Sequence, residues 1–239
     1  MKLFRTIAAA LLLTAPWLGA THAADNSSTG PSWGDTIEHW PDLQGGTWMA
    51  PNSDGAPHAE ELSILPGPRA QMEAEMKKFQ AGQLAGPCAP RGLPRHLGSE
   101  FFYSKGMILI LGTPDYYMVV RKVYMDGRQH DDSEAPSYFG QSIGHWEGKT
   151  LVIDTNNIEA DEELTDGLAS GGNTHLVERY TLLGPGVMQL DLTVDDAGVL
   201  AKPYHTVRIY HLQKGVDFTE AYCTNNRNLA GETDLTPPP

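Results

Sequence analysis

The sequence predicts a mainly β protein in which an antiparallel meander closes into a barrel, preceded by one helix. Three observations predict this fold: apolar and polar side chains alternate after residue 100, short turns separate the alternating runs, and no helical pattern interrupts them. Because helices do not alternate with the strands, a parallel α/β sheet is excluded. A meander of eight or nine strands usually closes into a barrel, which removes the exposed sheet edges.

Composition limits the classes of function. The 239 residues include 30 acidic and 17 basic ones, for a net charge of −13. That balance, with no basic run, argues against nucleic acid as a partner, because phosphate binding needs clustered Lys and Arg. The 40% of hydrophobic residues is enough for the core of one medium-sized domain.

Residues 1–23 have the layout of a secretory signal peptide. Lys2 and Arg5 precede an apolar run, which is followed by small residues ending at Ala23. The run is shorter than the roughly 20 residues that a transmembrane helix needs, so no membrane span is expected. The signal predicts a periplasmic or secreted protein.

The remaining chain divides into three parts. Residues 24–41 and 229–239 are rich in polar residues, Gly and Pro, and are expected to form a flexible arm and a flexible tail. Residues 42–228 are expected to form a single β-barrel domain with its N-terminal helix. In an exported chain, Cys88 and Cys223 are best interpreted as one structural disulfide. The alternative, a reactive thiol, needs a low-pKa environment that the sequence does not show.

One helix is predicted over Pro68–Ala81, where good helix formers follow a proline and Gly82 marks the end. Met72, Met76 and Phe79 fall on one side of it. Strands are predicted after it, joined by turns such as Lys105-Gly106 and Asp126-Gly127 that suit antiparallel hairpins. The predicted strands are Phe101–Tyr103, Met107–Leu111, Tyr116–Met125, Tyr138–Trp146, Thr150–Asn156, His175–Leu183, Val187–Val194, His205–Leu212 and Phe218–Thr224.

The longest gap between predicted strands runs from residue 157 to 173 and is acidic, then rich in Gly and Ser. A connection of this length without structure of its own is often a lid or a binding loop. A solvated, charged excursion is the alternative.

Charged residues occur in phase with apolar ones on several strands. Alternation places Glu178 on the same face as Tyr180, and it turns Arg121, Arg208 and Glu220 inward in the same way. Buried charges must be paired, so we expect either a polar cluster on the floor of an aromatic-lined cavity or an ion network that plugs the barrel. A β-bulge would turn these side chains to the opposite face of the sheet and would exclude both the polar cluster and the ion network. The expected ligand-binding residues are Tyr117, Tyr180, Tyr210 and Trp146.

Three histidines are candidates for proton transfer, because histidine titrates near neutral pH: His130, His145 and His175. The histidines show no metal-ligand spacing, and the chain has no phosphate-binding glycine loop. The sequence therefore predicts neither a metal site nor a cofactor.

The segment from Gly140 to Gly144 matches G-x-S-x-G, and Asp154 and His175 follow Ser142 in the order of an α/β-hydrolase triad. That motif needs a helix directly after the serine. Here another predicted strand follows, so the serine-hydrolase interpretation is disfavoured. The glycines are expected to relieve a strongly bent strand.

Four segments resemble a large family of exported bacterial proteins. They are YMDGRQH at 124–130, GQSIGHWEGKTLVIDT at 140–155, HLVER at 175–179 and CTNNRN at 223–228. The family pattern is D-G-R-x-H-P, G-H-S-I-G-x-W-E-G-D-T-L-V-V-D-T, H-x-V-E-R and C-x-E-N-N-R. The resemblance implies an exported protein and does not point to a particular reaction.

This chain departs from the pattern at several positions. Gln141 stands where His is usual, Lys149 replaces Asp, Asp131 replaces Pro, and Thr224-Asn225 replaces a pair with an acidic member. More loosely, Gly46-Thr47-Trp48 is similar to the G-x-W that opens lipocalins, which implies a lipocalin-like barrel.

Two functions follow from these expectations. The first is a cofactor-independent lyase or isomerase acting on a small hydrophobic, aromatic molecule. In it Glu178 is the acid or base, Arg121 and Arg208 hold a developing oxyanion, and the three candidate histidines relay protons. The second is a periplasmic carrier of an apolar ligand, in which Glu178 supports only stability or affinity. A structural envelope protein, without a cavity, is a third hypothesis.

Overall fold

The computed structural model describes residues 46–50, 57–81, 93–94, 98–104, 106–112, 119–131, 133–160 and 162–216. Several predictions fall outside these ranges: the signal peptide, most of the arm, the tail, the strand at 218–224, Tyr117, Glu220 and the Cys88–Cys223 disulfide. None of the helices described is long and apolar enough to cross a bilayer.

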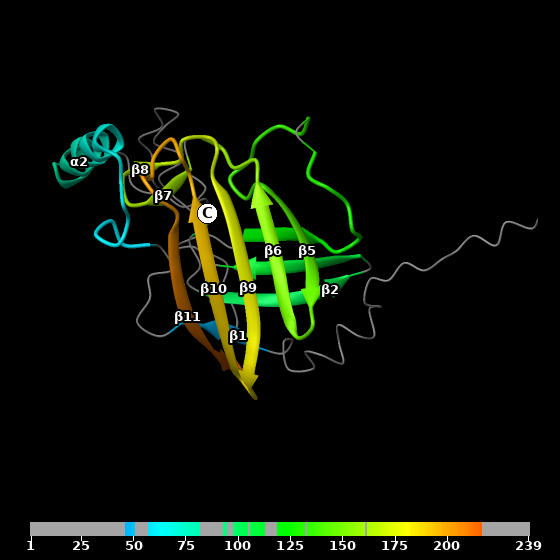
Figure 1. The fold of residues 1–239 in the computed structure, drawn as a ribbon. Coiled ribbons are helices and arrows are strands. Elements are labelled where there is room, and N and C mark those ends of the chain that lie inside the picture. Colours follow the sequence, from blue (N-terminus) through cyan, green and yellow to red (C-terminus); the bar gives the residue numbers. More distant parts are fainter. Residues whose placement is uncertain are drawn as a thin grey trace, which may run out of the picture.

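Within the described chain, nine strands close into a barrel in the order β1-β11-β10-β9-β6-β5-β4-β3-β2 (Figure 1). The predicted mainly β fold, with a closed barrel and an N-terminal helix, is confirmed, and it is consistent with a lipocalin-like barrel. The strands are β1 (Thr47–Met49), β2 (Gly98–Ser104), β3 (Met107–Gly112), β4 (Val119–Tyr124), β5 (Gln141–Glu147), β6 (Thr150–Asn156), β9 (His175–Gly184), β10 (Val187–Asp195) and β11 (Tyr204–Gln213).

The shortest of these strands, β1, closes the barrel. Trp48 pairs with Leu212 of β11 on one side and with Ser99 of β2 on the other. Its side chain is fully buried. Alternation along the longer strands fills the interior with apolar side chains, which removes them from water and stabilises the fold. The most deeply buried are Trp48, Phe101, Ile108, Leu151, Ile153, Leu176, Met188, Leu190 and Leu192.

One pairing in the barrel differs from the predicted antiparallel meander. β4 and β5 are parallel, through Val123 with Ser142 and Tyr124 with Ile143. The prediction of a hairpin turn at Asp126-Gly127 is therefore wrong. Parallel neighbours cannot be joined by a tight turn, so residues 125–140 form a long connection on the outside of the barrel. This connection carries His130.

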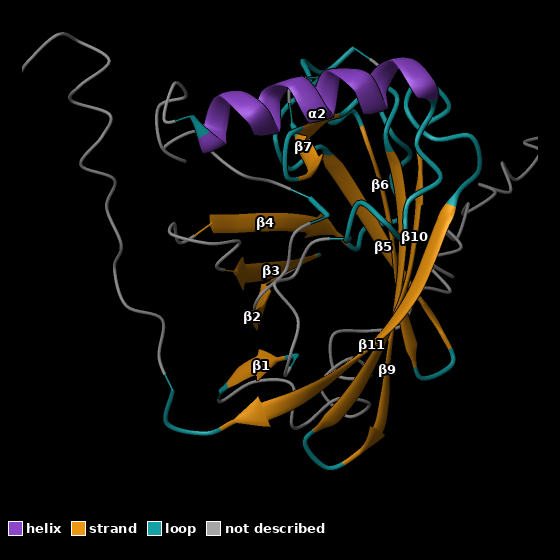
Figure 2. Ribbon diagram, turned by 90° about the vertical axis from the view of Figure 1, so that its left-hand side faces the viewer, coloured by secondary structure: helices purple, strands orange, loops and turns teal. Residues whose placement is uncertain are grey.

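The helix α2 (Pro66–Gln80) begins two residues earlier than predicted, with proline in its first turn. Met72 is its buried residue, whereas Phe79 is 55% exposed. The expected apolar side is thus wrong for Phe79, whereas Met72 is buried and Met76 is partly buried beside Gly167. The helix lies beside the barrel's end, next to β7 and β8 (Figure 2).

The gap at 157–173 has structure of its own. It contains a small two-stranded sheet, β7 (Glu163–Thr165) and β8 (Leu168–Ala169), which contacts α2. Leu164 and Leu168 are 1% and 2% exposed. The expectation of a solvated, charged excursion is therefore wrong, because the leucines of this segment belong to the apolar core. The alternative, a lid or a binding loop, stays a prediction.

Tyr103, a partly buried tyrosine on β2, is expected to make the stability fall at alkaline pH. Burial raises the pKa of Tyr103 well above its ordinary value of about 10. Above that pH the unfolded chain loses the tyrosine proton while the folded chain keeps it, so stability falls as the pH rises. We expect Tyr103→Phe to flatten the loss of unfolding free energy between pH 9 and 11, measured by urea denaturation. The difference in unfolding free energy between variant and parent at pH 7 sets the baseline. If the unfolding free energy of the variant falls as steeply with alkaline pH as that of the parent, the prediction is contradicted.

Candidate functional site

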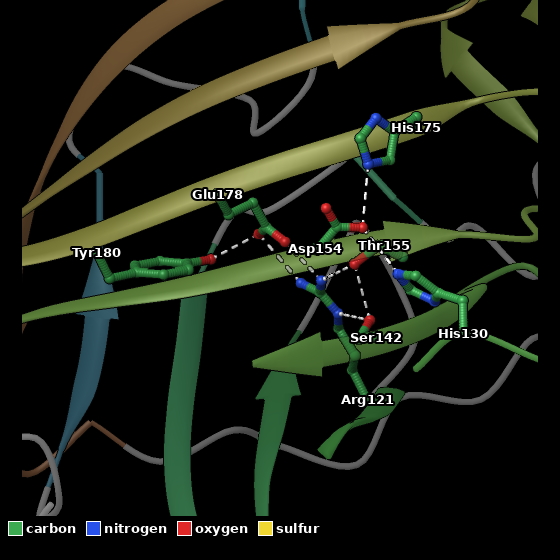
Figure 3. A network of polar contacts seen from close by, with 8 residues as sticks. All are labelled: Arg121, His130, Ser142, Asp154, Thr155, His175, Glu178 and Tyr180. Atoms are coloured by element: carbon green, nitrogen blue, oxygen red, sulfur yellow. Dashed lines mark hydrogen bonds and ion pairs between the residues drawn. The ribbon is translucent and has the colours of Figure 1, made fainter. Parts of the chain in front are cut away.

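A polar strip crosses the apolar interior of the barrel. Four neighbouring strands each contribute one inward side chain: Arg121 from β4, Ser142 from β5, Thr155 from β6 and Glu178 from β9 (Figure 3). Their exposure is 2% or less in every case. The predicted inward direction of Glu178 and Arg121 is confirmed.

Arg121 holds this strip together with all three of its guanidinium nitrogens. Nη1 donates to Glu178 Oε1 at 3.0 Å, and Nη2 donates to Glu178 Oε2 at 2.5 Å. Nε donates to Ser142 Oγ at 2.9 Å, and Nη2 also reaches Thr155 Oγ1 at 2.6 Å. The Tyr180 hydroxyl completes the network by donating to Glu178 Oε1 at 2.8 Å.

Electrostatics keep the pair ionised. Burial lowers the pKa of Arg121, but the charge and hydrogen bonds of Glu178 raise that pKa by more, so the net direction is upward. Burial and the Glu178 charge raise the pKa of Tyr180 well above its usual range, so Tyr180 stays a donor. Such a bidentate, charge-assisted pair is among the strongest polar interactions in a protein interior.

Both oxygens of Glu178 are therefore already hydrogen-bonded inside the barrel. To accept a substrate proton, the carboxylate would first have to give up a bond to Arg121 or Tyr180, in a place without water to replace it. The geometry fits the alternative of an ion network within the barrel better than it fits a free acid or base.

A second polar cluster lies on the outer face of the same strands. Asp154 Oδ1 accepts hydrogen bonds from two imidazoles: it is 2.8 Å from His130 Nε2 and 3.0 Å from His175 Nε2. The side-chain exposures are 19% for His130, 35% for Asp154 and 45% for His175. Solvent and solutes therefore reach this cluster, which we call the histidine–aspartate cluster.

Strand alternation explains why the two networks are separate. On β6, Thr155 points inward and Asp154 outward; on β9, Glu178 points inward and His175 outward. The long connection after β4 then brings His130 over the outer face. Histidines and Glu178 were predicted to act together, but the sheet lies between them.

The two histidines differ in what their second ring nitrogen contacts. Nδ1 of His130 is 3.0 Å from Gln141 Oε1, whereas Nδ1 of His175 has no hydrogen-bond partner in the part of the chain that the structure describes. When His175 Nε2–H donates to Asp154, the Nδ1 lone pair is free to accept a proton. An exposed imidazole oriented by a carboxylate is the arrangement of a general base.

The remaining predicted site residues, apart from Tyr180 of the barrel network, lie outside both clusters. His145 is on the outer face, 3.2 Å from Glu147, in a surface group of charges. Arg208 is half-buried near Tyr210, whose pKa is raised by burial and lowered in part by Arg208. Tyr180 and Tyr210 are each 2% exposed in the core, and Trp146 is half-buried beside it.

The G-x-S-x-G segment is not a nucleophile elbow. Ser142 is 1% exposed and bonded to Arg121, and β5 leads into β6 rather than into a helix. The glycines are required by close approach: Gly140 has φ +58°, and a Cβ at Gly144 would lie 2.5 Å from the Met125 sulfur. The expectation that these glycines relieve a strongly bent strand stays a prediction.

Sequence reasoning missed the parts played by Asp154 and Gln141. Asp154 was considered only as a member of a hydrolase triad, and Gln141 only as a departure from a family pattern. The feature that could have identified Asp154 is its outward position on the strand next to the one that begins with His175. Recognising it requires the β6–β9 register, which pairs Asp154 with Val177.

The cluster does not form a metal site within the described ranges. No group of three or more His, Cys, Asp or Glu is arranged there to hold a metal ion. A pocket of about 480 Å³ lies at the start of β11, away from every predicted site residue. It is lined by Glu61, Ser63, Lys202, Pro203, Tyr204, His205 and Thr206.

No family model, curated protein or solved structure matches this chain. The function must therefore be argued from the geometry of the two networks.

Proposed function

We propose that this protein is a cofactor-independent enzyme that moves protons on a small molecule, with His175 as the general base. One observation carries the proposal: Asp154 binds one nitrogen of a half-exposed imidazole and leaves the other nitrogen open. A carboxylate in this position fixes the tautomer and stabilises the imidazolium that forms when the base takes a proton.

The chemistry of such a base is that of a lyase or an isomerase. Nδ1 of His175 takes a proton from the substrate, and the positive charge that forms lies 3.0 Å from the Asp154 carboxylate. The imidazolium then returns that proton, either to another atom of the substrate, which is an isomerisation, or to a leaving group, which is an elimination. Neither route needs a cofactor.

The proposed substrate is a small, largely apolar aromatic molecule that the protein binds in the periplasm or outside the cell. This part of the proposal comes from the sequence, through the export signal and the aromatic strands. Tyr180 and Tyr210 lie in the packed core, on the other side of the sheet from His175, so they do not contact a molecule bound there.

The test uses a panel of small aromatic compounds, including lignin-like ones, incubated with the protein. Mass spectrometry follows both the small molecules in solution and the native complex. We expect a substrate to be converted and His175→Gln to reduce its turnover by roughly 10²- to 10⁴-fold, the usual contribution of a general base. Treatment with a chelator should leave the rate unchanged.

His145→Gln is the matched control, because His145 is also an outward histidine beside a carboxylate but belongs to an exposed ion pair. It is expected to keep the parent rate. Full turnover by His175→Gln, or an equal loss in both variants, would rule out His175 as the base.

A carrier of an apolar ligand in the barrel is the second candidate. The observation that favours it is that Arg121 and Glu178 form their hydrogen bonds with each other and with neighbouring side chains inside the barrel. A ligand bound there would therefore meet no free acid or base. In the same experiment a carrier would retain a panel compound on the protein with its mass unchanged, and His175→Gln would not alter that binding.

A further inference from the structure

Gln141 connects the barrel wall to the histidine–aspartate cluster. It is the first residue of β5, is 5% exposed, and faces the connection that carries His130. Two groups of that connection reach its side chain: the backbone N–H of Asp131 at 2.7 Å and Nδ1 of His130 at 3.0 Å. Both contact the same atom, Oε1.

The backbone contact fixes which end of the amide faces the histidine. A backbone N–H can only donate, so the atom that faces the Asp131 N–H must be the carbonyl oxygen of Gln141. An amide oxygen can only accept. Nδ1 of His130, which lies against the same oxygen, must therefore carry a hydrogen.

The other nitrogen of His130 faces an acceptor as well. Nε2 is 2.8 Å from Asp154 Oδ1, which also accepts from His175. With acceptors on both sides, His130 satisfies its contacts only as the doubly protonated imidazolium. The charged neighbours on its own connection are engaged elsewhere, since Asp126 pairs with Arg128, and Asp131 accepts from Ser133.

We propose that Gln141 is a positioning residue that holds both ring nitrogens of His130 as hydrogen-bond donors and thereby assigns the role of base to His175. This inference rests on the proposed function for its catalytic consequence. Before a substrate proton is taken up, the positive charge of His130 disfavours a second cation on the neighbouring His175. His175 therefore starts the reaction neutral, with its Nδ1 open.

The test reads the protonation of the rings directly. In the full chain labelled with ¹⁵N, the imidazole signals of His130 at pH 7 are expected to show hydrogen on both nitrogens, and those of His175 hydrogen on Nε2 alone. Assignments come from His130→Gln and His175→Gln spectra. An unprotonated nitrogen on His130 in the unsubstituted protein would overturn the inference.

Two substitutions of similar shape isolate the oxygen of Gln141. Gln141→Glu keeps an acceptor for both donors, so His130 is expected to stay doubly protonated. Gln141→Met removes the acceptor, so His130 is expected to become neutral at one nitrogen, and kcat to fall on the order of 10- to 100-fold with KM nearly unchanged. Identical His130 spectra in the two variants would overturn the role of Gln141.

The two proposals fail separately. If the spectra agree with the expectation but His175→Gln keeps full turnover, the assignment of the base is wrong and the effect of Gln141 on His130 stands. If His175→Gln loses turnover but His130 is singly protonated, the base stands and the Gln141 inference is wrong.

Discussion

Arg121→Met is expected to lower the free energy of unfolding by about 3–5 kcal/mol, the cost of leaving one partner of a buried ion pair alone. Glu178 would then remain inside the barrel at 0% exposure without the guanidinium fork, although the Tyr180 hydroxyl still donates to it. Ser142 Oγ and Thr155 Oγ1 would also lose a donor. Urea denaturation followed by circular dichroism measures the change.

Two further variants test whether the loss of stability comes from breaking the ion pair or only from removing a charge or a large side chain. Arg179→Met removes an outward arginine that pairs with Glu147 at 2.5 Å, where both side chains are at least 40% exposed. Solvent screens that pair, so stability should stay near that of the parent. Combining Arg121→Met with Glu178→Leu should cost less than the sum of the two single changes, because neither charge is then left unpaired. Additive losses would contradict the interpretation of the strip as one network.

The second large effect is expected at Asp196, which is 0% exposed between β10 and β11. Its carboxylate accepts the N–H of Gly171 at 2.8 Å, the Thr174 hydroxyl at 2.6 Å and the N–H of Gly198 at 3.0 Å. It thus joins the segment before β9 to the turn after β10. Asp196→Asn places an amide NH₂ against one of these donors, and we expect a loss of about 2–4 kcal/mol.

Asp195→Asn is the matched control, since it makes the same change at the adjacent, exposed residue. Thermal unfolding of both variants should show a lower Tm for Asp196→Asn and almost no change in Tm for Asp195→Asn. Equal Tm values would mean that the buried carboxylate does not hold the two segments together.

Local patterns in the sequence were enough to predict most of the barrel. β6 has the predicted bounds, β9 and β10 differ from prediction by one residue at one end, and β11 differs by one residue at each end. Alternating side chains and short turns specify a strand and its faces without reference to the rest of the chain. The same alternation placed Glu178 and Arg121 inside. The strands in the gap at 157–173 were not predicted, because β7 and β8 have only three and two residues and such short strands show no clear alternation.

Tertiary structure decided which polar residues meet. Arg121 and Glu178 are 57 residues apart and join only because β4, β5, β6 and β9 are neighbours in the closed sheet. Asp154 and His175 meet because β6 and β9 are neighbours, and His130 joins them because β4 and β5 are parallel, which sends the connection over the outer wall. Sequence alternation determines the face on which a side chain lies, but strand order and register determine its partner, and these depend on contacts between distant segments.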